Sequence, residues 1–380
     1  MPPVVSPAMA AIRVAFDTGP LHGARTGIGH AVAELQAALA DRPDVDLQPY
    51  LLSFRATPQP PAVRLPMPAA LAHRLWPRLP WPRMDRHLGD VQVVHGTNYV
   101  VPPTRHPAVV SVYDCWFLRH PELASSAVRR AGEVLKAAVR RGAHVHASSH
   151  ATAAAVAELL PGVPVTTVHL GPLPLPDPLP RSPLAELAEH RFVLAVGTVE
   201  RRKNLPTLVR AFAVPAADDP QLRLVLAGSP GDATDAVRVA IDGLPPAIGR
   251  RVLLTGRIDE PTRGWLLRNA AVLAYPSLDE GFGFPLLDAM QAGVPVVASD
   301  AGSIPEVAGD AALRCPAEDH ERLGALLTEA ITDQAVAGRL VAAGRTQVGH
   351  FSWARCAADM VNLYEVVAGQ TGSSPVRPAT

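Results

Sequence analysis

The sequence predicts an α/β protein with two Rossmann-like domains that face each other across a cleft. First, short apolar runs rich in β-branched residues alternate with helical patterns along the chain, which is typical of buried parallel strands joined by helices. Second, the length of 380 residues exceeds the roughly 250–300 that one hydrophobic core usually organises. Third, a Pro-rich stretch divides the alternation into two halves. Two domains joined by a linker imply a cleft, where we expect the ligand.

The first half, residues 1–170, is predicted to form one domain. Its apolar runs alternate with stretches whose apolar residues recur at helical spacing, as in βαβ units. A Pro-rich segment at 56–83, which contains Trp76 and Trp81, is too long for an ordinary connection. We therefore expect it to be functional or mobile and to lie at the mouth of the cleft. The predicted strands are 12–17, 91–95, 108–114 and 144–148, and the predicted helices are 28–40 and 121–141.

Prolines at every second position from 172 to 180 remove backbone donors and favour an extended chain, which predicts a linker at 171–190. The alternation then restarts and predicts a second Rossmann-like domain at 191–349, followed by a helix at 350–369. The last residues, 370–380, have little to bury and are predicted to be a disordered tail. The predicted strands of the second domain are 192–196, 222–227, 251–255, 271–275 and 295–299.

Composition excludes several classes of protein. Hydrophobic residues at 48% and charged residues at 18% exclude a wholly disordered chain, and no apolar run approaches the length of a membrane span. The 35 basic and 35 acidic residues cancel, so we expect no nucleic-acid partner bound by bulk phosphate neutralisation. Three widely spaced cysteines indicate neither a disulfide framework nor a zinc site. The N-terminus lacks the basic segment of a signal peptide, so we expect a cytoplasmic protein.

Ligands of open α/β sheets bind beyond the carboxyl ends of the strands, so the residues after each apolar run are informative. The run 192–196 is followed by Gly197 and by three consecutive cations, Arg201, Arg202 and Lys203, ahead of a predicted helix. A planar guanidinium and a compact ammonium together suit a diphosphate. The alternative is a solvated Arg-rich loop. The place between a strand and a helix, and the presence of only two lysines in the chain, favour an anion site.

A second site candidate follows the run that ends at residue 275. Gly281 and Gly283 permit close backbone approach, and a helix predicted from Phe284 supplies unpaired N–H groups, so anionic oxygen should dock there. Glu280 can accept hydrogen bonds from sugar hydroxyls, and Asp288, nearly two turns along, can accept them from a vicinal diol such as a ribose. The alternatives are a carboxylate that satisfies the helix dipole, for Glu280, and a solvated helix residue, for Asp288.

Two places in the first half carry weaker signals. Gly27 and Gly29 lie in a Gly-rich turn that enters a helix, which indicates either tight-turn chemistry or a second phosphate loop facing the first. Asp114 ends an apolar strand and is either a catalytic carboxylate or a turn-capping aspartate. For His95, at the end of the run 91–95, a site role and a structural role are equally open.

Taken together, these segments resemble the family-4 (group 1) retaining glycosyltransferases of the GT-B fold, in particular mannosyl- and rhamnosyltransferase-like members. VGTVERRKNLPTLVRAF (196–212) is similar to the family's strand–RK–helix donor motif, and EGFGFPLLDAMQAGVPVVASDAGSIPEV (280–307) is similar to its E-x7-E region. GARTGIGHAVAEL, HGTNYVVPP, YDCWFLRHPE and SSHATAAAVAELLP match more loosely in the first half. The resemblance covers most of residues 12–367, and its last part, 351–367, is similar to the final helix that packs on the N-terminal domain.

The resemblance implies a role for each matching residue. The catalytic residues would be Asp114, Arg202, Lys203 and Glu280, with Arg202 and Lys203 on the donor diphosphate and Glu280 on the donor sugar. Asp288 would take the ribose hydroxyls. The N-terminal domain would bind the acceptor and the C-terminal domain the nucleotide sugar, and neither a metal nor another cofactor is implied. Further donor-binding positions would be Gly27, Gly29, Gly197, Ile258, Gly281, Phe282, Gly283 and Phe284.

Two positions depart from the family pattern. The second acid of E-x7-E is Asp288, one methylene shorter than glutamate, and this change can shift a hydrogen bond. The histidine that usually precedes the N-domain aspartate is Tyr113. A phenol with a pKa near 10 cannot act as a histidine-like base or cation at neutral pH.

The implied reaction moves a hexosyl or deoxyhexosyl group from a nucleoside-diphosphate sugar to a hydroxyl of a glycan, a lipid-linked glycan or a small-molecule acceptor. Two rivals stay open: a nucleotide-sugar epimerase or phosphorylase of the same architecture, and a non-catalytic sugar-nucleotide binding module. The basic helix predicted around 128–141 suits either weak peripheral contact with an anionic membrane or a solvated helix face. We expect the protein in the cytoplasm or at the inner face of the membrane.

Overall fold

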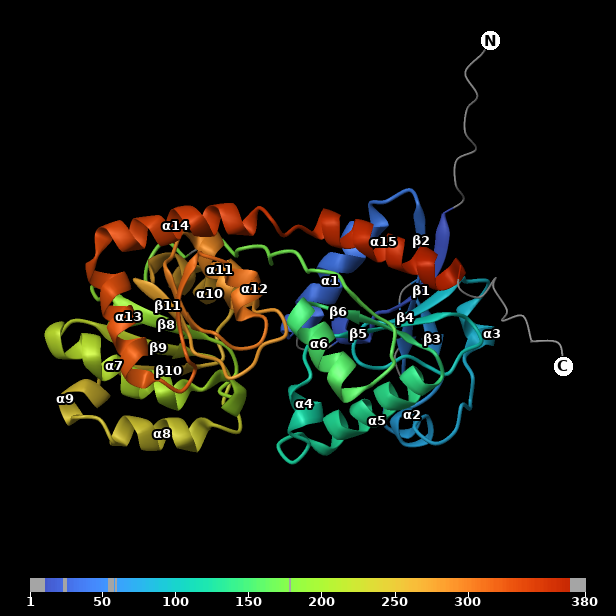
Figure 1. Cartoon of the computed structure of the whole chain (residues 1–380), viewed down its shortest axis with the longest axis horizontal. Helices are drawn as coiled ribbons and strands as arrows, with labels where there is room; N and C mark the ends of the chain where they lie inside the picture. Colours follow the sequence, from blue (N-terminus) through green and yellow to red (C-terminus); the bar gives the residue numbers. More distant parts are fainter. Residues whose placement is uncertain (1–10, 23–25, 54–57, 59, 178, 370–380) are drawn as a thin grey trace, which may run out of the picture. The chain divides into compact units, whose positions relative to one another are not determined.

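The computed structural model describes residues 11–22, 26–53, 58, 60–177 and 179–369 (Figure 1). The described chain forms two compact units. Unit 1 combines the residues up to Gly171 with those from Ser352 onward, and unit 2 comprises Pro172–Phe351. The predicted tail at 370–380 and Gly23, at the start of the first Gly-rich motif, lie outside the described residues.

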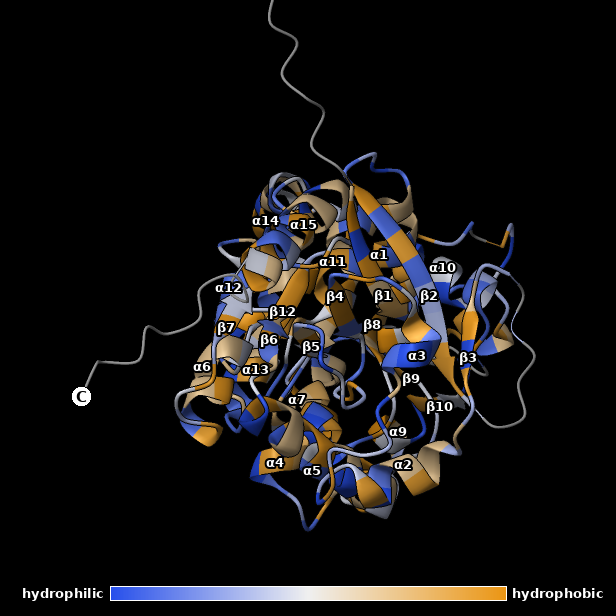
Figure 2. Ribbon diagram, turned by 90° about the vertical axis from the view of Figure 1, so that its right-hand side faces the viewer, coloured by the Kyte–Doolittle hydropathy of each residue, from blue (hydrophilic) through white to orange (hydrophobic). Residues whose placement is uncertain are grey.

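Unit 1 contains a parallel sheet of seven strands in the order β3-β2-β1-β4-β5-β6-β7. The apolar runs form its central strands, and β1 is paired with β2 on one side and with β4 on the other. In Figure 2, β2 carries both hydrophobic and hydrophilic residues along its length. The strands are β1 (Ile12–Asp17), β2 (Val45–Leu52), β3 (Val63–Leu65), β4 (Val93–Gly96), β5 (Ala108–Val112), β6 (His144–Ala147) and β7 (Val165–Thr167).

Helices cover this sheet and connect its strands. The last of them, α15, contacts α1 and the strands β1, β4 and β5, so the end of the described chain is part of unit 1. Gly171 lies against Trp353, at the point where the chain re-enters unit 1, and a Cβ at Gly171 would stand 2.5 Å from the Trp353 nitrogen. The helices are α1 (Gly27–Ala40), α2 (Ala69–Leu75), α3 (Asp85–Leu88), α4 (Trp116–Arg119), α5 (Ser126–Arg140), α6 (His150–Leu159) and α15 (Trp353–Gly369).

The Pro-rich segment 56–83, treated in the sequence as one long connection, contains regular secondary structure in its described residues. They form the edge strand β3, which pairs with β2, and the helix α2, which packs on α5. Trp76 is fully buried in the core, whereas Trp81 is 66% exposed. The sequence pattern did not predict β3 and α2. β3 has only three residues and prolines flank both elements, so neither shows a detectable hydrophobic period.

The core of unit 1 contains a chain of buried polar side chains. Tyr364 of α15 lies 2.7 Å from Nδ1 of His95, whose Nε2 lies 2.8 Å from Ser111, and Ser111 lies 2.8 Å from Nδ1 of His146. Nε2 of His146 donates to the carbonyl of Val168, which fixes one proton on each ring. Burial lowers the pKa of both histidines, that of His146 to about 4, so both are neutral. His95 therefore has a structural role, tying α15 to the sheet.

Unit 2 contains a second parallel sheet, of six strands in the order β10-β9-β8-β11-β12-β13. Two parallel-sheet α/β units confirm the predicted fold class. The strands are β8 (Phe192–Val196), β9 (Arg223–Ala227), β10 (Val252–Gly256), β11 (Val272–Tyr275), β12 (Val296–Ser299) and β13 (Ala312–Cys315), and the helices are α7 (Leu205–Asp218), α8 (Thr234–Asp242), α9 (Pro246–Gly249), α10 (Glu260–Asn269), α11 (Phe284–Ala292), α12 (Ile304–Ala308), α13 (His320–Thr332) and α14 (Gln334–Val348).

The start of the Pro-rich segment at 171–190 is hydrogen-bonded to helices of unit 2. Gln291 of α11 donates to the carbonyl of Leu173 at 3.0 Å, and Arg268 of α10 donates to the carbonyl of Pro176 at 2.6 Å. A proline has no N–H to donate, but its carbonyl still accepts hydrogen bonds. Side chains of neighbouring helices can therefore anchor a Pro-rich segment that is not paired with a strand. Within the described residues, no helix is both long enough and apolar enough to cross a membrane.

Candidate functional site

The strand order of unit 2 places the candidate site. β8 and β11 are neighbours, and from them the chain proceeds in opposite directions, to β9 and β10 on one side and to β12 and β13 on the other. This arrangement is a topological switch point, and ligands of open α/β sheets bind beyond the carboxyl ends of the strands there. The cations at 201–203 follow β8, and Glu280 follows β11. The sequence candidates of unit 2 thus lie in the two loops that flank the switch point.

The loop after β8 adopts a tight conformation that only certain residues permit. Gly197 has φ 138°, and a Cβ at Gly228, after β9, would collide with the Gly197 carbonyl. Arg201–Lys203 form one turn of 3-10 helix, and Asn204 follows in the left-handed conformation with φ 53°. The carbonyl of Arg202 accepts a 2.7 Å hydrogen bond from the Leu278 N–H. That bond joins the two loops of the switch point.

Asn204 holds three loops together. Its Nδ2 donates to the carbonyl of Pro276, at 3.2 Å, and to the carbonyl of Ala317, at 2.7 Å, while its Oδ1 accepts from Thr207 at 2.8 Å. These partners follow β11, follow β13 and lie in α7, respectively. Asn204 is therefore a positioning residue for Lys203, its neighbour in the chain.

Arg202, Lys203 and Glu280 form one cluster. Nη1 of Arg202 lies 2.5 Å from Oε2 of Glu280, and Nζ of Lys203 lies 2.6 Å from Oε1. Lys203 also donates to the Tyr275 hydroxyl at 2.9 Å, and Ser277 donates to Oε1 of Glu280 at 2.7 Å. The side chains of Arg202 and Lys203 are only 15% and 13% exposed, which rules out a solvated loop for these two cations.

Electrostatics keep the cluster ionised. Burial alone would raise the pKa of Glu280, but the neighbouring charges of Arg202 and Lys203 outweigh it and lower that pKa to about 2. Burial lowers the pKa of Lys203, and the Glu280 carboxylate opposes this effect. Two cations share one buried carboxylate, and a second carboxylate, Glu200, lies 3.7 Å from Arg202 but is 44% exposed, so the buried part of the cluster carries an excess of positive charge. An arrangement of this kind favours an anionic ligand.

The helix that follows Glu280 adds an oriented N–H group. α11 begins after Gly283, which has φ 94°, and no side chain of a described residue caps its N-terminus. Pro285 has no N–H, and the Leu286 N–H donates to the Gly283 carbonyl at 3.0 Å, so the Phe284 N–H is the one at this end that can reach an anionic ligand. Phe282 is buried and packs edge-to-face on Phe284, with ring centroids 5.3 Å apart, which fixes the turn.

The loop after β12 supports the backbone of Glu280. The Ser303 N–H donates to the Glu280 carbonyl at 3.0 Å. Gly302 has φ 55°, and a Cβ there would stand 2.5 Å from the Glu280 nitrogen, so a side chain cannot be accommodated. The direction of the Glu280 side chain therefore depends on a loop whose role the sequence alone did not reveal.

Asp288 is buried in α11 and is paired with Arg263 of α10. Oδ2 of Asp288 lies 2.6 Å from Nη1 of Arg263, whose Nη2 lies 2.9 Å from Glu260. Burial raises the pKa of Asp288 to about 7, although Arg263 opposes the shift. Oδ1 is buried and, among the described residues, has no hydrogen-bond partner. The alternative of a solvated helix residue is therefore wrong, and one buried carboxylate oxygen has no donor among the described residues.

The remaining candidates lie at loop ends. Ile258 in unit 2 is half-buried and precedes Asp259, whose carboxylate caps α10. In unit 1, Gly27 and Gly29 form the first turn of α1, where the N–H of Gly29 donates to the side chain of Thr26. Asp114 is half-buried, and its Oδ1 accepts from the Trp116 N–H at 3.1 Å, as a turn-capping aspartate does.

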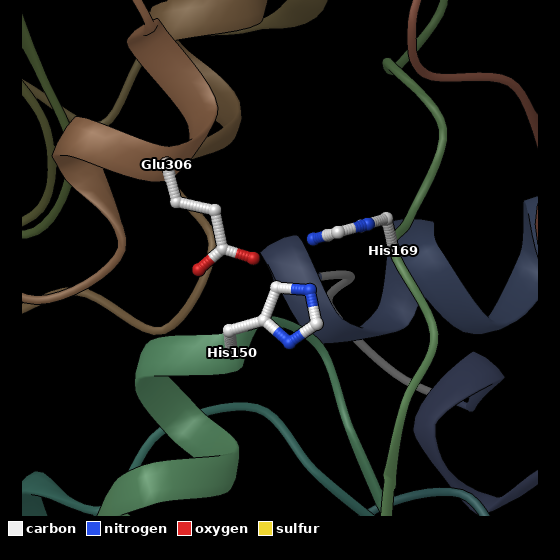
Figure 3. Close-up of side chains that lie close together, drawn as sticks. All are labelled: His150, His169 and Glu306. Atoms are coloured by element: carbon white, nitrogen blue, oxygen red, sulfur yellow. The ribbon is translucent and has the colours of Figure 1, made fainter.

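Another pair in unit 1 carried no sequence signal. The rings of His150, which begins α6, and His169, which follows β7, meet edge to face with centroids 5.3 Å apart (Figure 3). The contact fastens the segment after β7 to the start of α6. The two residues are 19 positions apart, and only the pairing of β6 with β7 brings them together.

Comparisons with known proteins show what this chain is similar to. Residues 181–347 match the family described as glycosyl transferases group 1, and this range contains the whole site of unit 2. O-antigen chain mannosyltransferase B of Escherichia coli is 28% identical over 290 residues, which are 72% of this chain and 74% of that protein. The phosphatidyl-myo-inositol mannosyltransferase of Mycolicibacterium smegmatis is 30% identical over 200 residues, 52% of this chain and 48% of that protein.

This chain is a glycosyltransferase whose residues 181–347 match the group 1 family. Its fold matches those of solved enzymes over nearly the whole chain. Sucrose-phosphate synthase from Thermosynechococcus elongatus superposes with a TM-score of 0.71 at 22% identity, covering 95% of this chain and all of that one. WaaG, a glycosyltransferase involved in lipopolysaccharide biosynthesis, superposes with a TM-score of 0.67 at 14% identity, covering 93% of this chain and 99% of that one. At these identities the likeness establishes the GT-B fold alone.

Sequence reasoning missed several residues that shape the site of this glycosyltransferase. Asn204 had a signal, because it directly follows the cations and asparagine tolerates the left-handed conformation. Tyr275 and Ser277 flank the end of a predicted strand, where polar residues are informative. Arg263 had none, because its partner lies 25 residues away on another helix.

Proposed function

We propose that this glycosyltransferase moves a mannosyl-class hexosyl group from a nucleoside-diphosphate sugar to a sugar hydroxyl, with retention of configuration. The observation that carries the proposal is the buried cluster of Arg202, Lys203 and Glu280 beside the uncapped end of α11. The mannosyl class is supported by the names of the relatives, an O-antigen chain mannosyltransferase and a phosphatidyl-myo-inositol mannosyltransferase. The same names favour a glycan or a lipid-linked sugar as acceptor.

Departure of the nucleoside diphosphate is the step that the cluster stabilises. As the bond between the anomeric carbon and the phosphate oxygen breaks, negative charge grows on the diphosphate and positive charge on the sugar ring. Arg202, Lys203 and the N–H of Phe284 at the start of α11 stabilise the negative charge. Their positions are fixed before the reaction by Glu280, Tyr275 and the loops around them, which is the condition under which electrostatic stabilisation is most effective.

The two acidic residues have separate roles. Glu280, kept ionised by its cations, orients them and accepts hydrogen bonds from hydroxyls of the donor sugar. Asp288 uses its unpartnered Oδ1 to accept a hydrogen bond from a ribose hydroxyl, while Arg263 holds the other oxygen. Arg263 thus supports the shorter side chain that stands where the family pattern has glutamate.

We propose that the reaction needs no metal ion. Both carboxylates of the site are already engaged by cations, Glu280 by Arg202 and Lys203 and Asp288 by Arg263. A divalent ion prefers carboxylates that are free to coordinate it. The fixed cations instead supply the neutralisation that the departing diphosphate requires.

Retention follows when the acceptor attacks from the face that the diphosphate leaves. The acceptor oxygen forms a bond to the anomeric carbon as the carbon–phosphate oxygen bond breaks, and the hydroxyl proton passes to the departing phosphate oxygen. No nucleophile from the protein takes part. Glu280 is unsuited to that role because its two oxygens already bind Lys203 and Arg202.

A donor screen tests the proposed function. Purified protein is incubated with GDP-mannose, UDP-glucose and dTDP-rhamnose, the melting temperature is recorded, and transfer to methyl α-mannoside is followed by mass spectrometry. We expect one donor to raise the melting temperature, because a ligand that binds only the folded state stabilises it, and to yield an α-linked disaccharide. Absence of stabilisation by all three donors, or a product with inverted linkage, contradicts the proposal.

We also propose weak peripheral contact with an anionic membrane through α5. Arg129, Arg130 and Lys136 line a groove of about 390 Å³ together with Phe117 and Leu118 of α4 and with Glu133, which pairs with Lys136. Cations beside apolar side chains suit an interface with acidic headgroups. In flotation with vesicles of phosphatidylglycerol and phosphatidylcholine at low salt, the protein should float, and simultaneous Ala replacement of the three cations should abolish this. Recovery of all wild-type protein in the bottom fraction contradicts the contact.

A further inference from the structure

One oxygen of the Asp288 carboxylate is committed to Arg263. Oδ2 lies 2.6 Å from Nη1 of Arg263, and the two side chains are only 6% and 13% exposed. Glu260 holds the guanidinium in turn, because its Oε2 accepts from Nε at 3.0 Å and from Nη2 at 2.9 Å. A carboxylate that accepts from two N–H groups of a guanidinium restricts its rotation. We therefore expect Oδ2 to stay occupied when a nucleotide binds.

The segment 173–176 packs on both helices that carry this pair. Gln291 of α11 donates to the Leu173 carbonyl at 3.0 Å. A Cβ at Gly264 of α10 would stand 2.6 Å from the Pro176 carbonyl oxygen, so this close contact requires glycine. A third element thus joins α10 to α11, which keeps the guanidinium and the carboxylate at their short distance.

The other oxygen of Asp288 is buried and lacks a protein donor. Among the described residues, Oδ1 has no hydrogen-bond partner. Burial raises the pKa of Asp288 to about 7, and the charge of Arg263 opposes this shift. A ribose has two vicinal hydroxyls, whereas Asp288 offers them a single acceptor atom. The carboxylate therefore cannot pair each hydroxyl with an oxygen of its own.

The number of free acceptor atoms decides whether a carboxylate recognises the 2′-hydroxyl of a nucleotide. A carboxylate with two free oxygens pairs with both hydroxyls of ribose. A 2′-deoxyribose leaves one of these buried oxygens without a donor, which costs free energy. A carboxylate with one free oxygen is satisfied by either hydroxyl, and 2′-deoxyribose still supplies the 3′-hydroxyl. The second arrangement does not reject a deoxynucleotide.

We propose that this glycosyltransferase binds 2′-deoxyribonucleoside diphosphates nearly as tightly as ribonucleoside diphosphates, so that deoxynucleotide sugars belong to its donor class. This inference rests on the proposed function, in which Asp288 faces the sugar of the nucleoside, and adds a selectivity to it. Arg263 determines that selectivity, because it occupies one of the two acceptor oxygens. It acts through Asp288 and is a positioning residue.

Calorimetric titration of matched nucleotides tests the inference. GDP, dGDP, UDP and dUDP are titrated into wild type, Asp288→Asn and Asp235→Asn. Asp235 is the matched control, because it is a helical carboxylate of unit 2 that also pairs with an arginine but is 95% exposed. For the base that binds, wild type and the control should bind the ribo and deoxy forms within about threefold of each other. One lost hydrogen bond to a charged group would cost roughly 10-fold or more.

Asp288→Asn separates the contact from the selectivity. The amide oxygen can keep the hydrogen bond to Arg263, which puts an NH2 donor in the place of the acceptor Oδ1. Both forms of the nucleotide should then bind about 10-fold more weakly, with their ratio unchanged. Unchanged affinities in this variant would mean that Asp288 does not contact the nucleoside sugar, and they overturn the inference.

Arg263→Ala tests the origin of the selectivity. It frees Oδ2, so at pH 9, chosen to keep the carboxyl ionised, this variant should prefer the ribonucleotide by about 10-fold. An unchanged ratio contradicts the role of Arg263.

The wild-type titrations separate this inference from the proposed function. A preference of 10-fold or more for the ribonucleotide overturns the inference and leaves the proposed function standing. Failure of all four nucleotides to bind overturns both.

Discussion

The two units of this glycosyltransferase have the same strand order around their switch points but place different chemistry there. In unit 2, two cations and a carboxylate follow the central strands. In unit 1, whose switch point lies between β1 and β4, Asp17 ends β1 and Asn98 follows β4, and no described cation pairs with the Asp17 carboxylate. The comparison teaches that the fold fixes where a ligand binds, while the residues after the strands fix its charge. A diphosphate suits the first set, whereas the second set lacks a described cation to neutralise it.

Lys203→Ala should give the largest effect, because it removes a fixed charge from the site of the departing diphosphate. We expect turnover to fall by about 10²- to 10³-fold, the range found when one preorganised donor of a developing anion is removed. The measurement is the initial rate of transfer at saturating donor. The other lysine of the chain, Lys136, is the control, since Lys136→Ala should retain wild-type turnover. Near-wild-type turnover in Lys203→Ala would remove the basis for assigning the donor site to unit 2.

Asn204 tests how far the switch point of unit 2 depends on its loops. Asn204→Ala loses hydrogen bonds to two carbonyls and keeps a left-handed residue with a Cβ, so we expect a loss of about 2 kcal/mol in the free energy of unfolding. Asn204→Gly should recover about 1 kcal/mol, because glycine adopts this conformation more easily. Urea denaturation followed by circular dichroism measures both. Equal stability of Asn204→Ala and wild type would mean that the loops hold their positions without this side chain.

A variant at Arg263 tests whether its guanidinium is needed to keep Asp288 ionised for binding the ribose. Removing the guanidinium leaves the Asp288 carboxyl buried without its cation, which favours the protonated form and weakens its acceptance of a ribose hydroxyl. We expect Arg263→Ala to weaken binding of the nucleotide sugar about 10-fold, the lower range for a hydrogen bond to a charged group. Arg268→Ala, on the same helix, is the control. An unchanged dissociation constant in Arg263→Ala would separate Asp288 from nucleotide binding.

The pH dependence of stability should distinguish Asp17 and Asp288 from Glu280, with the smallest effect of this series. Asp17 and Asp288 each have a pKa raised to about 7, so the folded state holds a proton that the unfolded state loses near pH 4. Their contribution to the free energy of unfolding is fully present below pH 4 and is lost as the pH rises to 7. Glu280, with its pKa lowered to about 2, acts oppositely, since its contribution is lost as the pH falls below 4.

Asparagine variants isolate these contributions. Between pH 4 and 7, the free energy of unfolding of Asp17→Asn and of Asp288→Asn should each change less steeply with pH than that of wild type. The measurement is chemical denaturation at a series of pH values. Asp90→Asn should keep the wild-type slope, because Asp90 is exposed. A wild-type slope in both variants would mean that neither carboxyl has a raised pKa.

The sequence predicted most of what lies near the switch points. The central strands were recognisable because they are buried on both faces and read as continuous apolar runs. β2 was missed because VDLQPYLL contains Asp, Gln and Pro, and β13 because it has only four residues, one of them an arginine. Strand pairing, which the local pattern does not encode, makes strands of these segments.

Within the candidate site, position along the chain predicted more than local pattern did. Arg202, Lys203 and Glu280 could be selected because each follows a strand, and the structure brings them together. Their partners could not be selected, since Arg263 meets Asp288 only through the packing of α10 on α11. Asp17 was passed over because it was counted as the end of a strand, and its lack of a paired cation among the described residues is a property of the folded chain.

Calorimetric titration of a nucleoside diphosphate and its monophosphate tests the central claim most directly. GDP and GMP, or UDP and UMP if that base is bound, are titrated into wild type and Lys203→Ala. The account predicts that wild type prefers the diphosphate by at least 10-fold and that Lys203→Ala binds both with nearly equal affinity, because we propose that Lys203 contacts the second phosphate. A Lys203→Ala variant that retains the full preference for the diphosphate would contradict it.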